Sequence, residues 1–351
     1  MARASARRVA RNRGPWWAWL CVVVGTLLTV ASGGALAGFS ILTDRYTGGI
    51  PADDLLGDVR GERGTRETLA GPLNILLVGS DYRKNPELKG TLWRADTIMV
   101  LHVPRSHDQA YLISFPRDTM VDIPDSGNSR WKGGEDKINS AFTHGGNGAS
   151  GYRLLARTLS DLLDIRFDSG AVIDFYGFVN VVQALGGVDL CIETPKGKQK
   201  LRSIHPPYRV FEKGCRHYDG HAALDYVRQR KQFNDGDFAR MRHQQEFLKA
   251  LLAQTREQGL HRDLGKLDRV IRAAGPALTV DNTLPVADLA FTLRNIRPEN
   301  LTAIQVPVEG RNEGTWYAEL VDPAPDLFRA VREETVGAWS VQNPKYVNPL
   351  T

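Results

Sequence analysis

The chain contains the stretch Leu73-Asn74-Ile75-Leu76-Leu77-Val78-Gly79-Ser80-Asp81, in which an almost continuous apolar run ends at a glycine. A short apolar run bounded in this way is typical of a strand buried within a sheet. Residues 97–103 and 110–115 are similar runs joined by a polar turn, so they predict two further strands. Asp81 follows the first strand directly, which is where the binding sites of open α/β sheets lie.

The rest of the chain shows helical patterns that alternate with strand patterns. Helical spacing covers residues 152–163, 176–185, 238–258, 264–274 and 285–295, and further strands are expected at 172–175, 188–192 and 301–306, the last of the sheet. This alternation predicts an α/β fold, a mixed β-sheet flanked by helices on both faces in three layers (αβα). We expect the domain at residues 72–322, followed by a loosely ordered C-terminal tail at 323–351.

The N-terminal region predicts a membrane anchor. Five arginines precede residue 14, whereas residues 14–43 carry no charge and exceed the roughly 20 residues that a membrane-spanning helix needs. We therefore expect a cytoplasmic basic tail at 1–13, one transmembrane helix at 14–43, an extracellular stalk at 44–71, and a folded domain outside the cell membrane. The alternative is a signal peptide cleaved after Ala35-Leu36-Ala37. These arginines supply most of the net charge of +5, so binding to nucleic acid has little electrostatic support.

Two aspartates near the strand ends are candidate metal ligands. If the strands at 73–78 and 97–103 run antiparallel, Asp81 and Asp96 lie at the same edge of the sheet. Two carboxylates together with substrate phosphates are a common way to hold Mg²⁺. Arg94 precedes Asp96 by two residues and points to the same face of an extended segment. Each aspartate taken alone also fits an ordinary turn residue.

Arginines recur close to the same segments. Arg83 lies just after Asp81, Arg117 follows the strand at 110–115, and Arg228 and Arg230 share one face if their segment is extended. An arginine side chain keeps its charge, so burying several of them requires anions. Arginines that converge with two carboxylates indicate a site that holds phosphate with a divalent metal.

The helix predicted at 238–258 separates a site residue from a surface residue. At 100° per residue, Gln244, Phe247 and Leu251 fall within about 40° of Arg240, so Arg240 and Gln244 begin a core-facing stripe. Arg242 points about 160° away, and we expect it to be solvated. Asp237 is a candidate N-cap. A polar pair near a helix N-terminus suits an anion, and the alternative is a buried salt bridge between Arg240 and an aspartate.

The cysteines Cys191 and Cys215 flank a polar insertion. Outside the cell they can form a disulfide that closes this loop, and the alternative is two free thiols. Neither has a second ligand at metal spacing, which argues against zinc.

The chain resembles the LytR-CpsA-Psr proteins of bacterial cell envelopes over about residues 72–258. The likeness rests on six ordered motifs, which are residues 74–81, Arg94-Ala95-Asp96-Thr97, Ser114-Phe115-Pro116-Arg117-Asp118-Thr119, residues 137–141, Gly186-Gly187-Val188-Asp189, and Tyr226-Val227-Arg228-Gln229-Arg230 continuing to Gly236-Asp237-Phe238-Ala239-Arg240. The pair of cysteines resembles that of actinobacterial members.

The resemblance implies a membrane-anchored phosphotransferase that moves a glycopolymer from a polyprenyl-pyrophosphate carrier to peptidoglycan and forms a phosphodiester. It implies Mg²⁺, or alternatively Mn²⁺, at Asp81 and Asp96, which are also the candidate bases. It implies pyrophosphate binding and catalysis by arginines and one glutamine, which are Arg94, Arg117, Arg228, Arg240 and Gln244, with Arg83 and Arg230 as neighbours in the same pocket. The family usually has arginine where this chain has His243.

The carrier's isoprenoid tail requires an apolar groove. Residues 175–182 are candidates for its lining, and their alternative role is ordinary core. Two other functions remain open at this point, which are a polyprenyl-pyrophosphate hydrolase and a non-catalytic binding or regulatory module of the envelope. The transferred polymer can be wall teichoic acid, capsule, a secondary polysaccharide or a protein glycan.

Overall fold

The computed structural model describes residues 52–349, with gaps at 61–68, 81–94, 129–130, 147, 261–262, 264–269, 271–272, 274–277 and 285. The predicted basic tail, transmembrane helix and most of the predicted helix at 264–274 lie outside the described residues, as do Asp81, Arg83 and Arg94. Within the described part of the chain, no helix has the length and apolar character needed to cross a bilayer.

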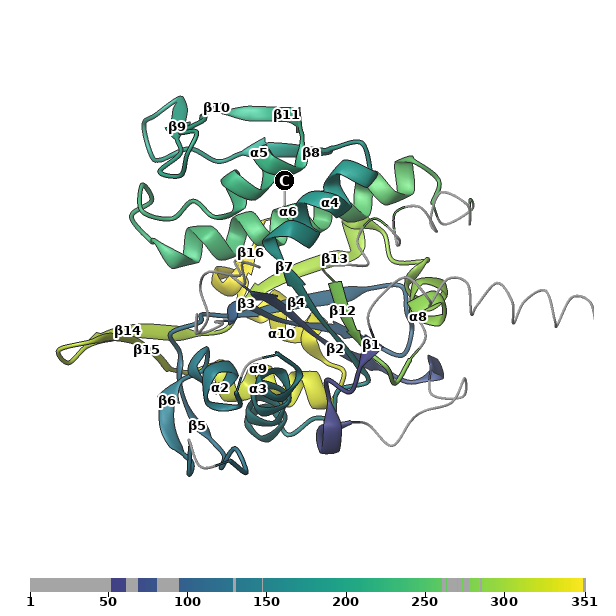
Figure 1. The fold of residues 1–351 in the computed structure, drawn as a ribbon, viewed down its shortest axis with the longest axis vertical. Coiled ribbons are helices and arrows are strands. Elements are labelled where there is room, and N and C mark those ends of the chain that lie inside the picture. The colour runs from purple at the N-terminus through teal and green to yellow at the C-terminus, as the bar shows by residue number, and fades with distance from the viewer. Residues whose placement is uncertain are drawn as a thin grey trace, which may run out of the picture. The chain divides into compact units, whose positions relative to one another are not determined.

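The predicted strand that opens the domain lies in the middle of an eight-stranded mixed sheet (Figure 1). The strands follow one another in the order β1 (Ala52–Asp53), β12 (Leu278–Asp281), β7 (Ser169–Asp174), β2 (Leu73–Ser80), β3 (Ala95–Val103), β4 (Ala110–Phe115), β13 (Leu301–Gln305) and β16 (Val347–Asn348). β2 pairs antiparallel with β3 and parallel with β7. Because β2 has neighbours on both sides and layers on both faces, its central residues from Ile75 to Val78 are all apolar.

Helices cover both faces of this sheet, which confirms the predicted mixed α/β architecture (Figure 1). One layer holds α2 (Ser140–His144), α3 (Gly148–Leu163), α9 (Ala324–Arg332) and α10 (Val336–Gln342), and the other holds α4 (Phe175–Ala184), α5 (Gly220–Val227) and α6 (Asp237–Glu257). The remaining elements among the described residues are α8 (Val286–Leu293), three short 3-10 helices (Gly57–Val59, Pro298–Asn300 and Pro344–Tyr346), and four two-stranded antiparallel sheets: β5 (Met120–Ile123) with β6 (Gly134–Lys137), β8 (Val188–Ile192) with β11 (Gly214–Tyr218), β9 (Lys200–Arg202) with β10 (Val210–Glu212), and β14 (Val308–Asn312) with β15 (Trp316–Leu320).

The main core lies between the sheet and the layer that contains α3. Leu76 and Val78 of β2 pack there with Tyr152 of α3, which is fully buried. The Tyr152 hydroxyl donates to the backbone oxygen of Leu76 at 2.6 Å. Gly170 of β7 gives this ring its space, since a Cβ at that position would lie 2.1 Å from the tyrosine oxygen. The contact therefore fixes α3 against the centre of the sheet.

The residues after Pro323 differ from the loosely ordered tail that we expected. They form α9 and α10, whose Leu327 and Trp339 are buried in the main core, and β16, which extends the sheet beyond β13. β13 is consequently not the last strand. α9 has a strong apolar stripe, but a helix this short gives only a brief periodic signal in the sequence.

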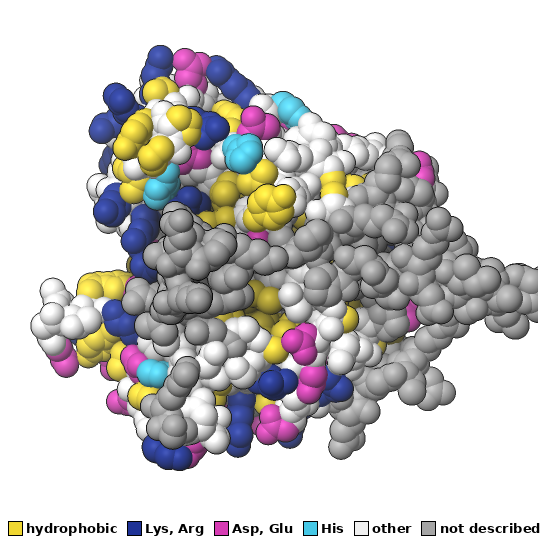
Figure 2. Space-filling view, viewed as in Figure 1, with side chains coloured by type: hydrophobic (Ala, Val, Ile, Leu, Met, Phe, Trp, Pro, Cys, Tyr) yellow, Lys and Arg dark blue, Asp and Glu magenta, His cyan; other side chains and the backbone are white. Residues whose placement is uncertain are grey.

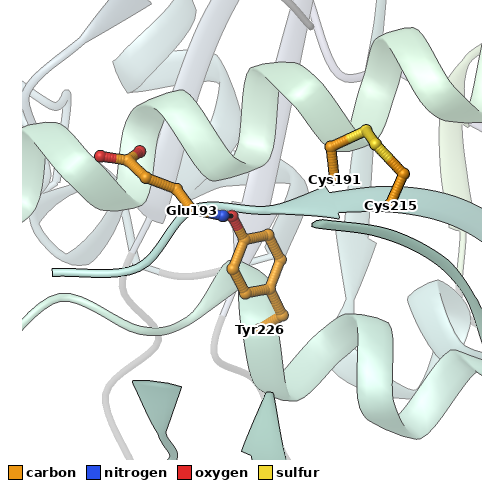
Figure 3. The surroundings of a disulfide bond; sticks show 4 residues. All are labelled: Cys191, Glu193, Cys215 and Tyr226. Atoms are coloured by element: carbon orange, nitrogen blue, oxygen red, sulfur yellow. Dashed lines mark hydrogen bonds between the residues drawn. A yellow bond between two sulfur atoms is a disulfide. The ribbon is translucent and has the colours of Figure 1, made fainter. Parts of the chain in front are cut away.

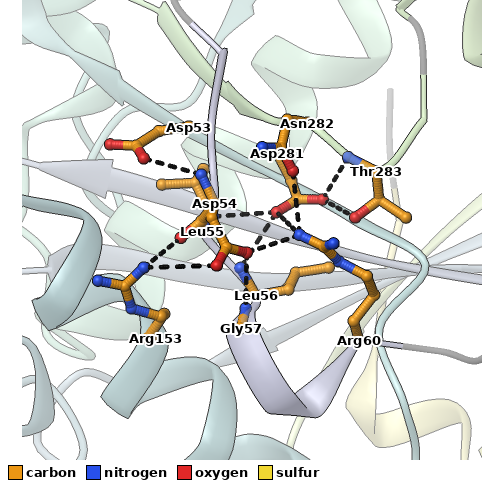
Figure 4. Close-up of polar contacts among 10 residues, drawn as sticks. All are labelled: Asp53, Asp54, Leu55, Leu56, Gly57, Arg60, Arg153, Asp281, Asn282 and Thr283. Atoms are coloured by element: carbon orange, nitrogen blue, oxygen red, sulfur yellow. Dashed lines mark hydrogen bonds and ion pairs between the residues drawn. The ribbon is translucent and has the colours of Figure 1, made fainter.

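The segment predicted as the end of a stalk is also part of the domain. Strand β1 joins the sheet beside β12, and Leu55 and Leu56 are buried in the main core. The buried carboxylate of Asp281 accepts from the backbone nitrogens of Leu55 at 3.0 Å and Leu56 at 3.1 Å (Figure 4). Arg60 donates to Asp54 at 2.6 Å on the same segment. We call the contacts of Asp281 with Leu55 and Leu56 the clamp. The sequence around these residues is polar, so it gave no sign of this contact.

The disulfide lies in the layer of α5 and α6. Strands β8 and β11 pair antiparallel with Cys191 opposite Cys215, and the two sulfurs are joined (Figure 3). Two residues after Cys191, just beyond the end of β8, the backbone nitrogen of Glu193 donates to the hydroxyl of Tyr226 on α5 at 2.8 Å. The bridged pair of strands is thereby attached to the helix that precedes Arg228.

We predict that Asp281→Ala lowers the free energy of unfolding by about 3 kcal/mol, because two buried backbone donors lose their acceptor. Asp53→Ala is the matched control, since this aspartate is exposed and should change stability by less than about 0.5 kcal/mol. Urea unfolding of both variants measures the difference. Equal stability of the two variants would refute the clamp.

We also predict that reducing the Cys191–Cys215 bridge lowers the free energy of unfolding by about 3 kcal/mol, because it releases a constraint on the unfolded chain. Unfolding with and without reductant measures this loss. A Cys191→Ser/Cys215→Ser variant is the control and should not respond to reductant. Two titratable thiols at these positions in the folded, untreated protein would contradict the assignment.

Candidate functional site

A pocket of about 680 Å³ lies between the sheet and the layer of α4 and α6. Its floor is the face of the sheet opposite the main core, where Leu77, Met99 and Ala171 lie side by side in register. Side chains alternate between the two faces of a strand, so the Leu77 side chain faces the pocket whereas those of Leu76 and Val78 are buried in the core. The continuous apolar run of β2 therefore serves two different apolar environments.

The walls of the pocket come from the two covering helices. They are Phe175, Phe178 and Val181 of α4 and Phe247, Leu248 and Leu251 of α6. The sequence left two roles open for the segment at 175–182, the lining of a groove and ordinary core. Both are found, since Phe175, Phe178 and Val181 line the pocket whereas Val179 and Val182 are buried. Most of the lining is apolar, which suits a hydrocarbon ligand.

One group of lining residues is charged. The cationic members are Arg117, Arg228, Arg230, Lys231 and Arg240, and the anionic members are Asp96 and Asp174. Gln244 also lines the pocket. The structure thus brings together every predicted site residue that it describes, and the cations exceed the carboxylates. Such a surplus inside a largely apolar pocket favours an anionic ligand.

Arg240 is the most buried of these cations, with 6% of its surface exposed. It donates to the backbone oxygen of Asp96 at 3.0 Å and pairs with Asp237 at 2.9 Å. Its Nε is buried and has no hydrogen-bond partner among the described residues. Burial lowers the pKa of Arg240, and the nearby Arg117 and Arg230 lower it further. The guanidinium is therefore held in place with one donor unused.

Of the two alternatives that the sequence left open at Arg240, the structure shows the salt bridge to Asp237, and the anion site stays a prediction. Asp237 is not the N-cap of α6, because that position is taken by Gly236 with φ of 52°. Asp237 instead lies in the first turn, where it also pairs with Arg230 at 3.5 Å. A left-handed backbone at Gly236 is easily adopted only by glycine, which explains this residue before the helix.

Arg117 is positioned by adjacent strands and by the following hairpin. Its Nη1 contacts the Asp96 carboxylate at 2.5 Å. Burial disfavours the charged form, but Asp96 outweighs this effect, so the pKa of Arg117 is raised. The motif at 137–141 supports this loop, since Lys137 pairs with Asp118 at 3.1 Å and Asn139 N donates to the Arg117 oxygen at 3.1 Å.

Arg228 and Arg230 line the pocket on either side of a residue that points elsewhere. The Arg228 guanidinium lies over the Phe175 ring, 4.4 Å from its centroid. Gln229 is fully buried, and its amide donates to Ser203 and to Asp225, both at 2.9 Å. Its role was missed in the sequence. The signal that could have identified Gln229 is its place between two arginines that share one face. In an extended segment, the side chain between them points to the opposite face.

The far side of α6 differs from our expectation that Arg242 is solvated. Arg242 pairs with Glu193 at 3.1 Å and also with Asp235. The buried His243 packs against Tyr226 with its Nε2 3.5 Å from Glu193, and burial lowers its pKa. His243 is therefore part of the packing behind the pocket and does not line it. The sequence gave no sign that Arg242 has a partner, because Glu193 lies 49 residues before it in the chain.

Asp96 is the one predicted metal ligand that the structure describes, and it lines the pocket. Within the described ranges, no cluster of three or more His, Cys, Asp or Glu residues is arranged to hold one. Mg²⁺ does not require such a cluster, because it commonly uses one or two carboxylates, substrate phosphates and water. The other predicted ligand, Asp81, lies outside the described residues. A hard carboxylate oxygen beside an anion site fits this ion.

Comparison with known proteins gives consistent results. The model of the LytR_cpsA_psr family matches residues 57–329. The probable cell wall biosynthesis protein LcpB of Corynebacterium glutamicum is 35% identical over 256 residues, which cover 69% of this chain but only 57% of LcpB. The polyisoprenyl-teichoic acid–peptidoglycan teichoic acid transferase TagU of Oceanobacillus iheyensis is 25% identical over 97% of this chain and 100% of TagU. The structure of TagT bound to LI-WTA has the same fold, with a TM-score of 0.60 and 23% identity over 82% of this chain and 98% of TagT.

The packing behind the pocket predicts a pH effect at Glu246. Burial is the larger cause and the Glu193 carboxylate the smaller cause that raise the pKa of Glu246 from 4.5 to about 7. Ionisation of Glu246 is therefore disfavoured in the folded protein. Stability should decline as the pH rises from about 4.5 to about 7, and Glu246→Gln should gain about 2–3 kcal/mol above this range. Urea unfolding at about pH 4 and pH 8 tests this, with equal stability of the two proteins expected at the lower value. A gain of the same size at both pH values would contradict the assignment.

Proposed function

The chain belongs to the LytR-CpsA-Psr family, and on this premise we propose that it is a phosphotransferase that moves a glycopolymer from a polyprenyl-pyrophosphate carrier to peptidoglycan. The observation that carries the proposal is the pocket, which combines apolar walls with a group of arginines. A polyprenyl pyrophosphate has the same two parts, a long hydrocarbon chain and an anionic headgroup. The name of TagU as a polyisoprenyl-linked teichoic acid transferase supports this choice of donor.

The apolar walls would hold the isoprenoid chain. Phe175, Phe178 and Phe247 supply large surfaces that exclude water from the ligand. Arg228 lies over the Phe175 ring and thus stands where the apolar wall meets the cations. This arrangement would place the pyrophosphate next to the first isoprene units.

The cations would hold the pyrophosphate and stabilise the charge that moves during transfer. An acceptor hydroxyl of peptidoglycan attacks the phosphorus that carries the saccharide. The bond from that phosphorus to the bridging oxygen breaks, and polyprenyl phosphate leaves with the electron pair. Arg117 and Arg240 are fixed by Asp96 and Asp237, so they need little rearrangement to bind the developing charge. The candidate acceptors of the hydroxyl proton are Asp81 and Asp96.

We propose that Asp96, together with Asp81, also holds Mg²⁺ or Mn²⁺ with oxygens of the pyrophosphate. Such an ion supplies neutralisation of phosphate charge. Asp96 is already oriented by Arg117, so the chain presents this carboxylate to the same space as the arginines. Removing the ion with a chelator should abolish transfer.

The donor is a membrane lipid, which agrees with the predicted anchor at residues 14–43. We propose that this segment holds the protein in the cell membrane with residues 1–13 in the cytoplasm and the domain outside. The site would then meet both the lipid carrier and the peptidoglycan.

We predict that Arg240→Ala abolishes transfer and weakens binding of polyprenyl pyrophosphate by about 2–5 kcal/mol, since a charge-assisted contact in a desolvated site is lost. The melting temperature should change little, because Asp237 keeps Arg230 as a partner. Transfer is measured with Mg²⁺ and a lipid-pyrophosphate-linked saccharide, with and without peptidoglycan.

The matched control for this experiment is Arg329→Ala, which removes an exposed arginine paired with Asp326 on α9. It should leave transfer unchanged. Normal transfer by folded Arg240→Ala would remove Arg240 from the site. Equal release of polyprenyl phosphate with and without peptidoglycan would identify a hydrolase, and no release in either case would indicate a binding module.

A further inference from the structure

The hairpin of β9 and β10 presents one face to the protein and the other to its surroundings. Leu201 and Phe211 lie opposite each other on the inner face and are buried in a second apolar cluster with Tyr226. On the outer face, Arg202 lies opposite Val210, and both are exposed. The exposed residues of this face and of the tip at 203–210, among them Arg202, Val210 and residues 206–208, are therefore not required for the packing of the domain.

The segment around this hairpin is strongly basic. Between residues 194 and 217 the single acidic residue is Glu212, whereas seven are basic: Lys196, Lys198, Lys200, Arg202, Arg209, Lys213 and Arg216. Glu212 pairs with Lys200 at 3.3 Å and with Arg216 at 2.5 Å. Lys196, Lys198 and Lys213 are exposed, and no ion pair with a described residue is found for them. The surface therefore has a marked surplus of positive charge.

Large apolar side chains are exposed at the tip among these charges. The exposed fractions are 37% for Ile204, 53% for Tyr208 and 55% for Val210. Figure 2 shows apolar and basic side chains interspersed over the part of the surface formed by β9 and β10. An exposed apolar group of this kind within a basic surface is typical of a segment that lies in the interface of a membrane.

The tip is attached to the candidate site at two points. Ile204 and His205 line the pocket, and because Ile204 is also exposed, the tip lies where the pocket opens to the surroundings. Behind the tip, the buried Ser203 donates to Asp225 at 2.6 Å and accepts from Gln229 at 2.9 Å. Gln229 stands between Arg228 and Arg230, so the tip and these two arginines are parts of one connected unit.

We propose that the tip of the β9–β10 hairpin docks on an anionic phospholipid bilayer, with Tyr208 and Val210 in the interface and the surrounding lysines on lipid headgroups. This inference rests on the proposed function, since it assigns the opening of the pocket to the membrane that holds the donor. A lysine near an anionic bilayer strengthens binding about fivefold, so several together suffice to orient a domain that is already anchored.

A soluble acidic polymer is the other anionic partner that the basic residues would accept. The exposed Tyr208 and Val210 favour the bilayer, because a hydrated polymer offers them no apolar environment. Their position at the opening of an apolar pocket also favours a lipid surface.

The test is hydrogen exchange of the full chain in lipid nanodiscs of phosphatidylcholine with and without phosphatidylglycerol. We expect slower exchange at residues 203–210 in the anionic discs, reversed by high salt and absent in Lys196→Glu/Lys198→Glu/Lys213→Glu. The same exchange in both discs would overturn the proposal. Slower exchange with soluble polyglycerol phosphate, but not with anionic discs, would assign the surface to an acidic polymer and also overturn it.

A transfer assay separates this inference from the function on which it rests. Tyr208→Asn/Val210→Thr should lower transfer from a bilayer-embedded donor about tenfold and leave transfer from a short, water-soluble donor unchanged. Asparagine suits position 208, where φ is 60°. Val341→Thr/Lys132→Glu is the control for both hairpin variants, because it makes the valine change and the lysine change at exposed positions in the other layer and on the β5–β6 hairpin.

Two outcomes of the transfer assay are informative. If the wild type is active and the tip variant transfers from the bilayer-embedded donor as fast as the wild type does, docking is contradicted. If the wild type transfers from neither donor, the proposed function fails, and the exchange experiment still decides whether the tip binds the bilayer.

Discussion

The guanidinium of Arg240 keeps its charge in water and in protein alike, and this fold buries it beside an apolar pocket. Asp237 and the backbone oxygen of Asp96 hold it there, yet its Nε stays without a partner among the described residues. Arg117 and Arg230 lie close enough to oppose its charge. An anionic ligand would satisfy the remaining donor and relieve this repulsion. The ligand that we propose, an anion with a hydrocarbon attached, would meet both features of the site.

The rest of the domain determines where this charge is placed. Helix α6 presents Arg240 and Phe247 to the pocket, while its other face carries Arg242 against Glu193. Glu193 belongs to the segment that follows the bridged strand β8, and its backbone nitrogen contacts α5. α5 ends next to Arg228. A contact network behind the pocket therefore sets the positions of the two helices whose residues would bind the headgroup.

Sequence patterns predicted the sheet and the grouping of the described candidate residues in one pocket, because both leave local signals. The apolar run of β2 and the spacing of Arg240 and Gln244 on α6 were sufficient to place them. Long-range polar contacts left no such signal. Glu193 pairs with Arg242 across 49 residues, and Asp281 binds Leu55 across 226, so neither partner was predictable from spacing. Short elements were missed for a related reason, since α10 and β16 depend on the main core and the sheet.

The central claim is that one pocket binds the lipid and the pyrophosphate together, and calorimetry on the full chain tests it most directly. Three ligands are compared: a polyprenyl pyrophosphate, the same polyprenyl chain with a neutral hydroxyl end, and inorganic pyrophosphate. The lipid pyrophosphate should bind far more tightly than either of the others, because each of them engages only the apolar walls or only the arginines. Equal affinity for the lipid pyrophosphate and for the neutral lipid, or for inorganic pyrophosphate, would contradict the account.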